Sequence, residues 1–224
     1  MHDLGVVIER LAYRPLREAP SLAVLITAIG VSYLLQQVAQ LSWSSNPKSF
    51  TSVVSGMKPV SLFGGQLTIS AETIVTIVAC VVIMVVLMWF VNYTPAGHAM
   101  LAVSEDRGAA QLMGVNVNGT ISLTFAIGSA LAAIAGALLC SSYPTLQPTT
   151  GAMPGIKAFV AAVFGGIGSI PGAMIGGFAI GLLEALVSAV GLSIWKDGVV
   201  FAILIVVLLV KPTGILGRPQ TEKV

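Results

Sequence analysis

The sequence predicts an all-α polytopic membrane protein. Three observations indicate this class: 56% of the 224 residues are hydrophobic, only 9% are charged, and the apolar residues gather in long runs. A soluble domain carries about 25% charged residues, and the mean hydropathy of this chain is +0.95. Because a helix rises about 1.5 Å per residue, roughly 20 apolar residues cross a bilayer.

The apolar runs predict about five full transmembrane helices plus one short or broken helix. The five long runs are 22–41, 71–92, 118–140, 170–191 and 197–210. The sixth run, 155–169, is short for a span, and the glycines in 163–168 predict a broken or kinked helix. Lipid cannot satisfy the freed backbone groups, so we expect the break inside protein or beside a cavity. The whole chain, 1–224, is then a single membrane domain.

The basic residues predict the orientation of the spans. If 155–169 counts as a crossing, seven of the eleven lysines and arginines fall on one side and four on the other. This bias favours a cytoplasmic loop at 93–117 and a cytoplasmic C-terminus. The apolar run 4–8 ends at Glu9 and Arg10, as the last turns of a span would, so we expect N-terminal helices to be lacking.

The loop 93–117 is the most patterned polar segment of the chain. Strong helix formers fill 98–113, and Gly114 stands where a helix can end. We therefore expect one short helix parallel to the membrane. A helix lying on lipid headgroups prefers a basic polar face, but only Arg107 is cationic here, against Glu105 and Asp106. The charges favour a soluble protein partner, and the candidate docking residues are Gly97, Glu105, Asp106, Ala109, Ala110 and Gly114.

Glu184 is the one acidic residue in the middle of a predicted span. A carboxylate inside the membrane is costly unless it is paired or hydrated. It either faces the interior near a permeation path or a helix end, or forms a hydrogen-bonded contact between helices. The other candidate pathway or helix-break residues are Gly165, Gly166, Gly168 and Pro171.

Small residues recur at helical spacing in two predicted spans. Gly128, Ala132 and Gly136 form one such face, and Gly172 and Gly176 begin another. In lipid these faces let helix backbones approach closely, either within the chain or at a subunit interface. Both cysteines, Cys80 and Cys140, lie in apolar runs, where we expect buried structural thiols rather than a disulfide.

Several classes of chemistry have no support in the sequence. The phosphate-binding pattern G-x-x-x-x-G-K-[ST] does not occur, and no Cys/His cluster has metal-ligand spacing. No acid, base and nucleophile cluster together, and a net charge of +2 does not suggest nucleic acid. We expect no catalysis, no cofactor and no metal. A secondary transporter or channel remains as an alternative, but it needs ion- or proton-binding groups at the midplane, where only Glu184 qualifies.

The chain resembles a known family over nearly its whole length. The stretches that carry the resemblance are 8–17, 26–32, 105–115, 121–128, 157–159, 165–177 and 211–219. They are similar to branched-chain amino acid ABC transporter permeases of the LivH type. The resemblance implies a multi-pass protein of the bacterial inner membrane. It also implies four kinds of partner besides the lipid bilayer: a second permease subunit, two cytoplasmic ATP-binding subunits and a periplasmic substrate-binding protein.

The resemblance has two departures and one open point. Members of the family usually carry more N-terminal membrane helices than the spans expected here. The family usually has arginine where His98 and Leu101 stand, so the loop 93–117 is less basic here. Urea and short-amide permeases share the fold, so a substrate of that kind is an alternative to branched-chain amino acids. ATP hydrolysis is expected in the partner subunits and not in this chain, and the loop 93–117 is expected to be the cytoplasmic loop that couples those subunits to the permease.

Overall fold

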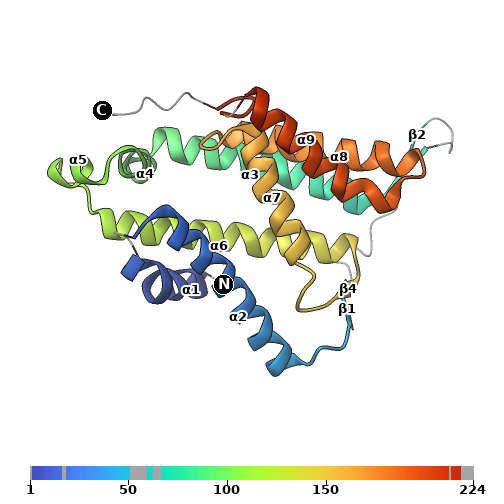
Figure 1. Ribbon diagram of the computed structural model, residues 1–224, viewed down its shortest axis with the longest axis horizontal. Coiled ribbons are helices and arrows are strands. Elements are labelled where there is room, and N and C mark those ends of the chain that lie inside the picture. The colour runs from blue at the N-terminus through green and yellow to red at the C-terminus, as the bar shows by residue number, and fades with distance from the viewer. Residues whose placement is uncertain (1, 17–18, 51–59, 63–66, 212, 218–224) are drawn as a thin grey trace. The chain divides into compact units, whose positions relative to one another are not determined.

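The computed structural model describes residues 2–16, 19–50, 60–62, 67–211 and 213–217. Helices make up most of the ribbon (Figure 1). The chain divides into two compact units, Met1–Thr150 and Gly151–Val224, and each has its own packing.

The first unit begins with a helix that changes its winding. Helix α1 (His2–Ile8) runs into a π-helical segment, Glu9–Tyr13, and a single 3-10 turn, Arg14–Leu16. The remaining helices of this unit are α2 (Ser21–Trp43), α3 (Ala71–Tyr93), α4 (Pro95–Glu105), α5 (Arg107–Leu112) and α6 (Val117–Ser142). Its short strands form two antiparallel pairs: β1 (Lys48–Ser49) with β4 (Thr145–Leu146), and β2 (Val60–Leu62) with β3 (Leu67–Ile69).

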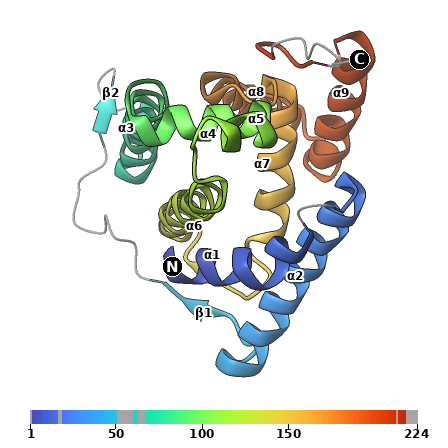
Figure 2. The same ribbon diagram turned by 90° about the vertical axis from the view of Figure 1, so that its left-hand side faces the viewer.

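The second unit is a bundle of three helices. They are α7 (Ala152–Gly165), α8 (Ile170–Ala189) and α9 (Lys196–Val210), and a 3-10 turn, Ser193–Trp195, precedes α9. Helices α7 and α8 lie side by side, as Figures 1 and 2 show. The buried core contains Val160, Ala161, Ile180 and Val200, with Phe201 and Leu204 packed against it.

The predicted number of spans is confirmed for the part of the chain that the structure describes. Five helices there are long and apolar enough to cross a membrane: Leu22–Trp43, Ala71–Tyr93, Val117–Ser142, Ile170–Ala189 and Ser193–Val210. Helix α7 is the short one, with 14 residues. At about 1.5 Å per residue it rises about 21 Å, less than the roughly 30 Å of a hydrocarbon core.

Polar side chains fix where five of the helices start. Each cap residue accepts a hydrogen bond from the backbone N–H three residues later, which satisfies a donor that the first turn leaves unpaired. The caps are Ser70 of α3, Thr94 of α4, Asp106 of α5, Asn116 of α6 and Ser169 of α8. The loops between the apolar runs therefore carry the signals that end one span and begin the next.

Only one of the two small-residue faces is packed within the described chain. An added Cβ at Gly176 would overlap the carbonyl oxygen of Ala161, and one at Gly172 would lie 2.5 Å from that of Gly165. These two glycines let α7 and α8 approach at backbone distance. At Gly128 and Gly136 an added Cβ would meet nothing within 4 Å, so the α6 face has no such neighbour among the described residues.

The cysteine expectation was wrong for one residue. Cys80 is exposed on α3, whereas Cys140 is half-buried, and both thiols are free. The apolar run around Cys80 forms helix α3, which has no buried residue among those described. An apolar run in a membrane protein does not tell which face of the helix is covered by protein.

Candidate functional site

Helix α4 folds back tightly on the end of α3. Thr94 lies between the two helices, and its Oγ1 accepts a hydrogen bond from the backbone N–H of Gly97 at 3.1 Å. Gly97 is buried, and an added Cβ there would overlap the carbonyl oxygens of Phe90 and Val91. The predicted site residue Gly97 is therefore a close-packing position, and α4 is held directly against the last turn of a span.

The single helix expected over 98–113 is wrong, because the chain breaks at Asp106. Helix α4 ends at Glu105, and Asp106 is extended, with φ −156° and ψ 110°. Its Oδ1 accepts a hydrogen bond from the backbone N–H of Ala109 at 3.0 Å. An aspartate that can cap a new helix competes with continuation of the old one. We call the two helices, their linking residue and the turn that ends α5, 95–114, the coupling segment.

Gly114 ends α5 as predicted. Its φ is +85°, and its N–H donates to the carbonyl oxygen of Gln111 at 3.0 Å. The N–H of Val115 donates to the carbonyl oxygen of Ala110, also at 3.0 Å. This pair of hydrogen bonds is the Schellman motif, which needs a residue that tolerates a left-handed conformation.

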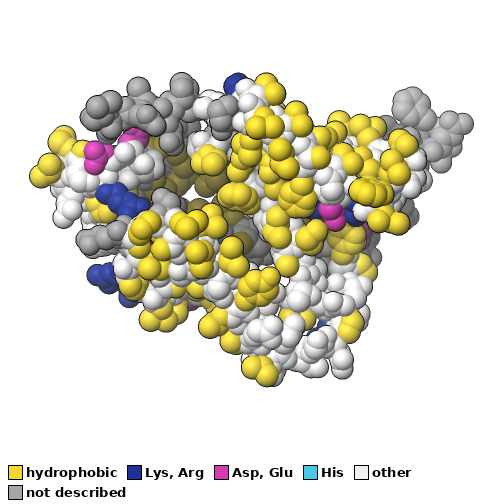
Figure 3. Space-filling view, in the orientation of Figure 1, with side chains coloured by type: hydrophobic (Ala, Val, Ile, Leu, Met, Phe, Trp, Pro, Cys, Tyr) yellow, Lys and Arg dark blue, Asp and Glu magenta, His cyan; other side chains and the backbone are white. Residues whose placement is uncertain are grey.

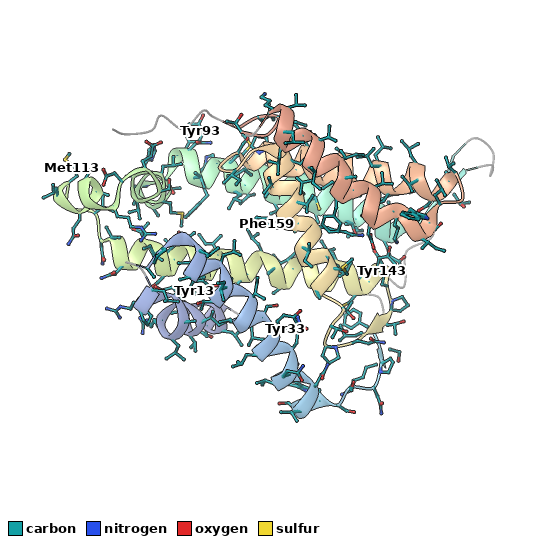
Figure 4. All side chains as sticks on the ribbon, viewed as in Figure 1. Tyr13, Tyr33, Tyr93, Met113, Tyr143 and Phe159 are labelled. Atoms are coloured by element: carbon teal, nitrogen blue, oxygen red, sulfur yellow. The ribbon has the colours of Figure 1, made fainter. Side chains whose placement is uncertain are left out.

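The coupling segment has a buried side and an exposed tip. Val103 and Ala110 are 7% and 4% exposed. Leu112 and Met113, by contrast, are 90% and 84% exposed, and Met113 lies at the far end of α5 in Figure 4. Sequence reasoning selected the acidic residues and missed this apolar pair, although two long apolar side chains before a helix-ending glycine were a visible signal.

The helix break expected in 163–168 lies where α7 ends, at Gly165. Gly166 and Gly168 have φ angles of +107° and +90°, which side-chain-bearing residues rarely adopt. Ser169 then caps α8 through a hydrogen bond from the N–H of Gly172 at 3.1 Å, and Pro171 lies in the first turn.

The C-terminal segment 213–217 covers this break. The N–H groups of Ile215 and Leu216 donate to the carbonyl oxygens of Phe164 and Gly165 at 3.0 and 2.9 Å. A Cβ at Gly166 would overlap the backbone of Gly217. The two carbonyls at the end of α7 have no intrahelical partners. The segment 213–217 supplies their hydrogen-bond donors from within the protein.

Glu184 belongs to an ion-paired cluster of three helices. Nζ of Lys157, on α7, lies 2.8 Å from Oε1 of Glu184 and 2.7 Å from Oδ1 of Asp197, on α9. We call these three residues the charged triad. The structure shows Glu184 in a contact between helices with an ionic partner, and its place on a permeation path stays a prediction. Sequence reasoning did not join the three residues, because 27 and 13 positions separate them along the chain.

Glu9 is a buried carboxylate that the sequence did not reveal. It is 0% exposed in the π-helical segment, and Oε2 accepts a hydrogen bond from Oγ of Ser122, on α6, at 2.8 Å. Nearby, Tyr13 and Phe125 have ring centroids 4.9 Å apart and line a pocket of about 450 Å³ together with Arg107 of α5. The first helix is thus tied to α6 close to the coupling segment.

Comparison with known proteins places the chain in a family. The family model described as "Branched-chain amino acid transport system / permease component" matches residues 4–208. The high-affinity branched-chain amino acid transport system permease protein LivH of Escherichia coli (strain K12) is 47% identical over 223 residues, which are 98% of this chain and 72% of LivH.

Two further relatives agree with this match. The permease protein BraD of Pseudomonas aeruginosa, also named for high-affinity branched-chain amino acid transport, is 46% identical over 98% of this chain and 72% of BraD. A probable branched-chain amino acid transport permease protein LivH of Methanocaldococcus jannaschii is 34% identical over 70% of this chain and 50% of its own length. No solved structure matches significantly. The chain belongs to the branched-chain amino acid transport permease family.

Proposed function

We propose that this chain is a permease subunit of an ATP-driven importer that carries branched-chain amino acids across the bacterial inner membrane. The observation that carries the proposal is the 47% identity to LivH over 98% of the chain. The five apolar helices of membrane length fit a multi-pass permease. The relatives named for this substrate also favour branched-chain amino acids over urea or short amides.

The partners we propose are a second permease, two cytoplasmic ATP-binding subunits and a periplasmic binding protein. An ATP-binding subunit would dock on the coupling segment. Its exposed tip, Leu112 and Met113, offers apolar surface that no described part of this chain covers. Such exposed apolar groups at the end of a polar loop are typical of a protein-binding surface.

In this proposal the coupling segment would pass a displacement on to two spans. Gly97 holds α4 against the end of α3, and the buried side chains Val103 and Ala110 anchor it on its inner side. At its other end, the Schellman motif leads through Asn116 directly into α6. ATP binding in the partner subunits would favour one position of this segment, because a ligand shifts a conformational equilibrium only by differential affinity.

The test is transport by the assembled complex. The permease would be reconstituted in proteoliposomes with its second permease, ATP-binding subunits and binding protein, and uptake of labelled leucine and labelled urea compared. The proposal predicts leucine uptake that requires hydrolysable ATP and is not inhibited by excess urea. Uptake of urea in preference to leucine would assign the chain to the short-amide branch instead. Leucine uptake driven by an ion gradient without ATP would favour a secondary transporter and refute the proposal.

A further inference from the structure

The charged triad lies at one end of the three-helix unit. Lys157 is near the start of α7, Asp197 near the start of α9, and Glu184 in the last turns of α8. The opposite end of the same unit holds the turn after α7 and the tail 213–217. If the C-terminus is cytoplasmic, the triad lies toward the outer side of the membrane.

The triad holds charges of both signs at one place. One ammonium group serves two carboxylates, so the formal charge of the three side chains is −1. Lys196 precedes Asp197 in the chain, and its positive charge also acts on the Asp197 carboxylate. The cluster therefore offers both carboxylate and ammonium groups to a ligand that carries both charges.

The triad is also partly open. The exposed fractions of the side chains are 21% for Lys157, 23% for Glu184 and 36% for Asp197. Figure 3 shows a small group of acidic and basic side chains surrounded by hydrophobic ones over α8 and α9. Charged groups within a span face protein or a water-filled cavity rather than hydrocarbon. Elsewhere on α9, the exposed side chains are apolar, as at Val206 and Leu209, which suits a lipid-facing side.

We propose that the charged triad binds the head group of the transported amino acid. The α-ammonium would bind Glu184 and Asp197, and the α-carboxylate would bind Lys157. A zwitterion presents both charges at adjacent positions, so each charge of the head group can meet a triad side chain of the opposite sign. Urea and short amides have no charged head group, so the triad would also favour amino acids over them. This inference rests on the proposed function.

The first experiment measures whether water reaches the triad. Asp197→Cys is introduced into a Cys80→Ser, Cys140→Ala background, assembled with all partner subunits in right-side-out vesicles, and exposed to a charged thiol reagent that does not cross membranes. Val206→Cys, on the same helix, is the matched control. We expect Asp197→Cys to react at least tenfold faster than Val206→Cys. Equal and slow reaction of both would show that the triad is sealed, which would overturn the proposal.

The second experiment measures transport by variants that keep the shape of the triad. Glu184→Gln and Asp197→Asn should each lower leucine uptake per ATP hydrolysed about tenfold or more, because each removes a charge-assisted hydrogen bond to the substrate. ATP hydrolysis stimulated by the binding protein should continue. Lys157→Arg should retain more uptake than Lys157→Gln. Glu72→Gln, at the start of α3 and outside the triad, should stay within twofold of wild type.

The outcomes separate this inference from the proposed function. Failure of the wild-type complex to carry leucine with ATP would refute the proposed function. Normal wild-type uptake with unchanged uptake per ATP in both acid-to-amide variants would refute the triad site alone, leaving the triad as a helix contact. If Glu184→Gln does not assemble, Asp197→Asn decides the question, because Lys157 then still pairs with Glu184.

Discussion

Replacement of Leu112 and Met113 by serine tests whether the tip of α5 is the docking surface. The two side chains are 90% and 84% exposed, so the double variant should leave the stability of the permease unchanged. If the ATP-binding subunit buries both, each contributes about 1.5–3 kcal/mol. Their loss should therefore cost about 3 kcal/mol or more, which is a roughly 100-fold weaker association at 1.4 kcal/mol per tenfold change.

The assay is the affinity of the purified ATP-binding subunit for detergent-solubilised permease, measured together with the thermal unfolding temperature of the permease. Tyr143→Ser provides a matched control, because Tyr143 is 66% exposed and lies at the far end of α6 from the coupling segment. The control should bind within twofold of wild type. An unchanged affinity of the Leu112→Ser, Met113→Ser variant would refute the tip as a docking surface and favour the acidic residues Glu105 and Asp106 instead.

Three further predictions concern stability and coupling. Asp106→Ala should destabilise α5 by about 1 kcal/mol and uncouple ATP hydrolysis from uptake, because it removes the helix cap. Asp106→Asn can still cap the helix and should have neither effect. Amide hydrogen exchange over 107–112 and leucine uptake per ATP hydrolysed measure the two effects. Gly166→Ala should lower the unfolding temperature more than Gly168→Ala. Both strain a positive φ at about 1–2 kcal/mol, but only the first overlaps the backbone of Gly217; equal losses would contradict the role of the tail. Lys157→Met should lower the free energy of unfolding by about 2 kcal/mol. This is less than the loss of about 3–5 kcal/mol for a fully buried ion pair, because the triad is partly open. An unfolding temperature no lower than that of Lys157→Arg would contradict this.

The helices and many of their ends could be predicted from the sequence. The length of the apolar runs decides how many spans there are. A glycine at a helix end or break is needed for the backbone conformation at that position alone. Gly114 and Gly166 are cases where a positive φ allows little else. These features depend on neighbours within a few residues, which a single sequence displays.

The features that could not be predicted depend on partners distant in the chain. Nothing near Glu184 shows that Lys157 and Asp197 converge on it from two other helices. The run that ends at Glu9 suggested a polar helix end, but packing against α6 buries that carboxylate completely. At Asp106 the local signals conflicted, because helix formers on both sides favoured one helix while the aspartate favoured a new start.

The roles of the coupling segment and of the glycine break in transport stay predictions, because the structure gives the geometry of these segments and not their activity. The geometry shows which residues shape the segment and which are available to bind a partner. Gly97, Asp106 and Gly114 shape the coupling segment from within. Leu112 and Met113 are free of that task, so their substitution reports on docking rather than on folding.

Accumulation of labelled leucine in proteoliposomes that hold the complete complex tests the central claim most directly. Uptake would be measured with the loaded binding protein on one side, ATP on the other, and no ion gradient, and compared with ADP in place of ATP. We expect leucine to accumulate above its external concentration with ATP and not to accumulate with ADP. Equal accumulation with ADP, or accumulation that appears only with an imposed ion gradient, would contradict it.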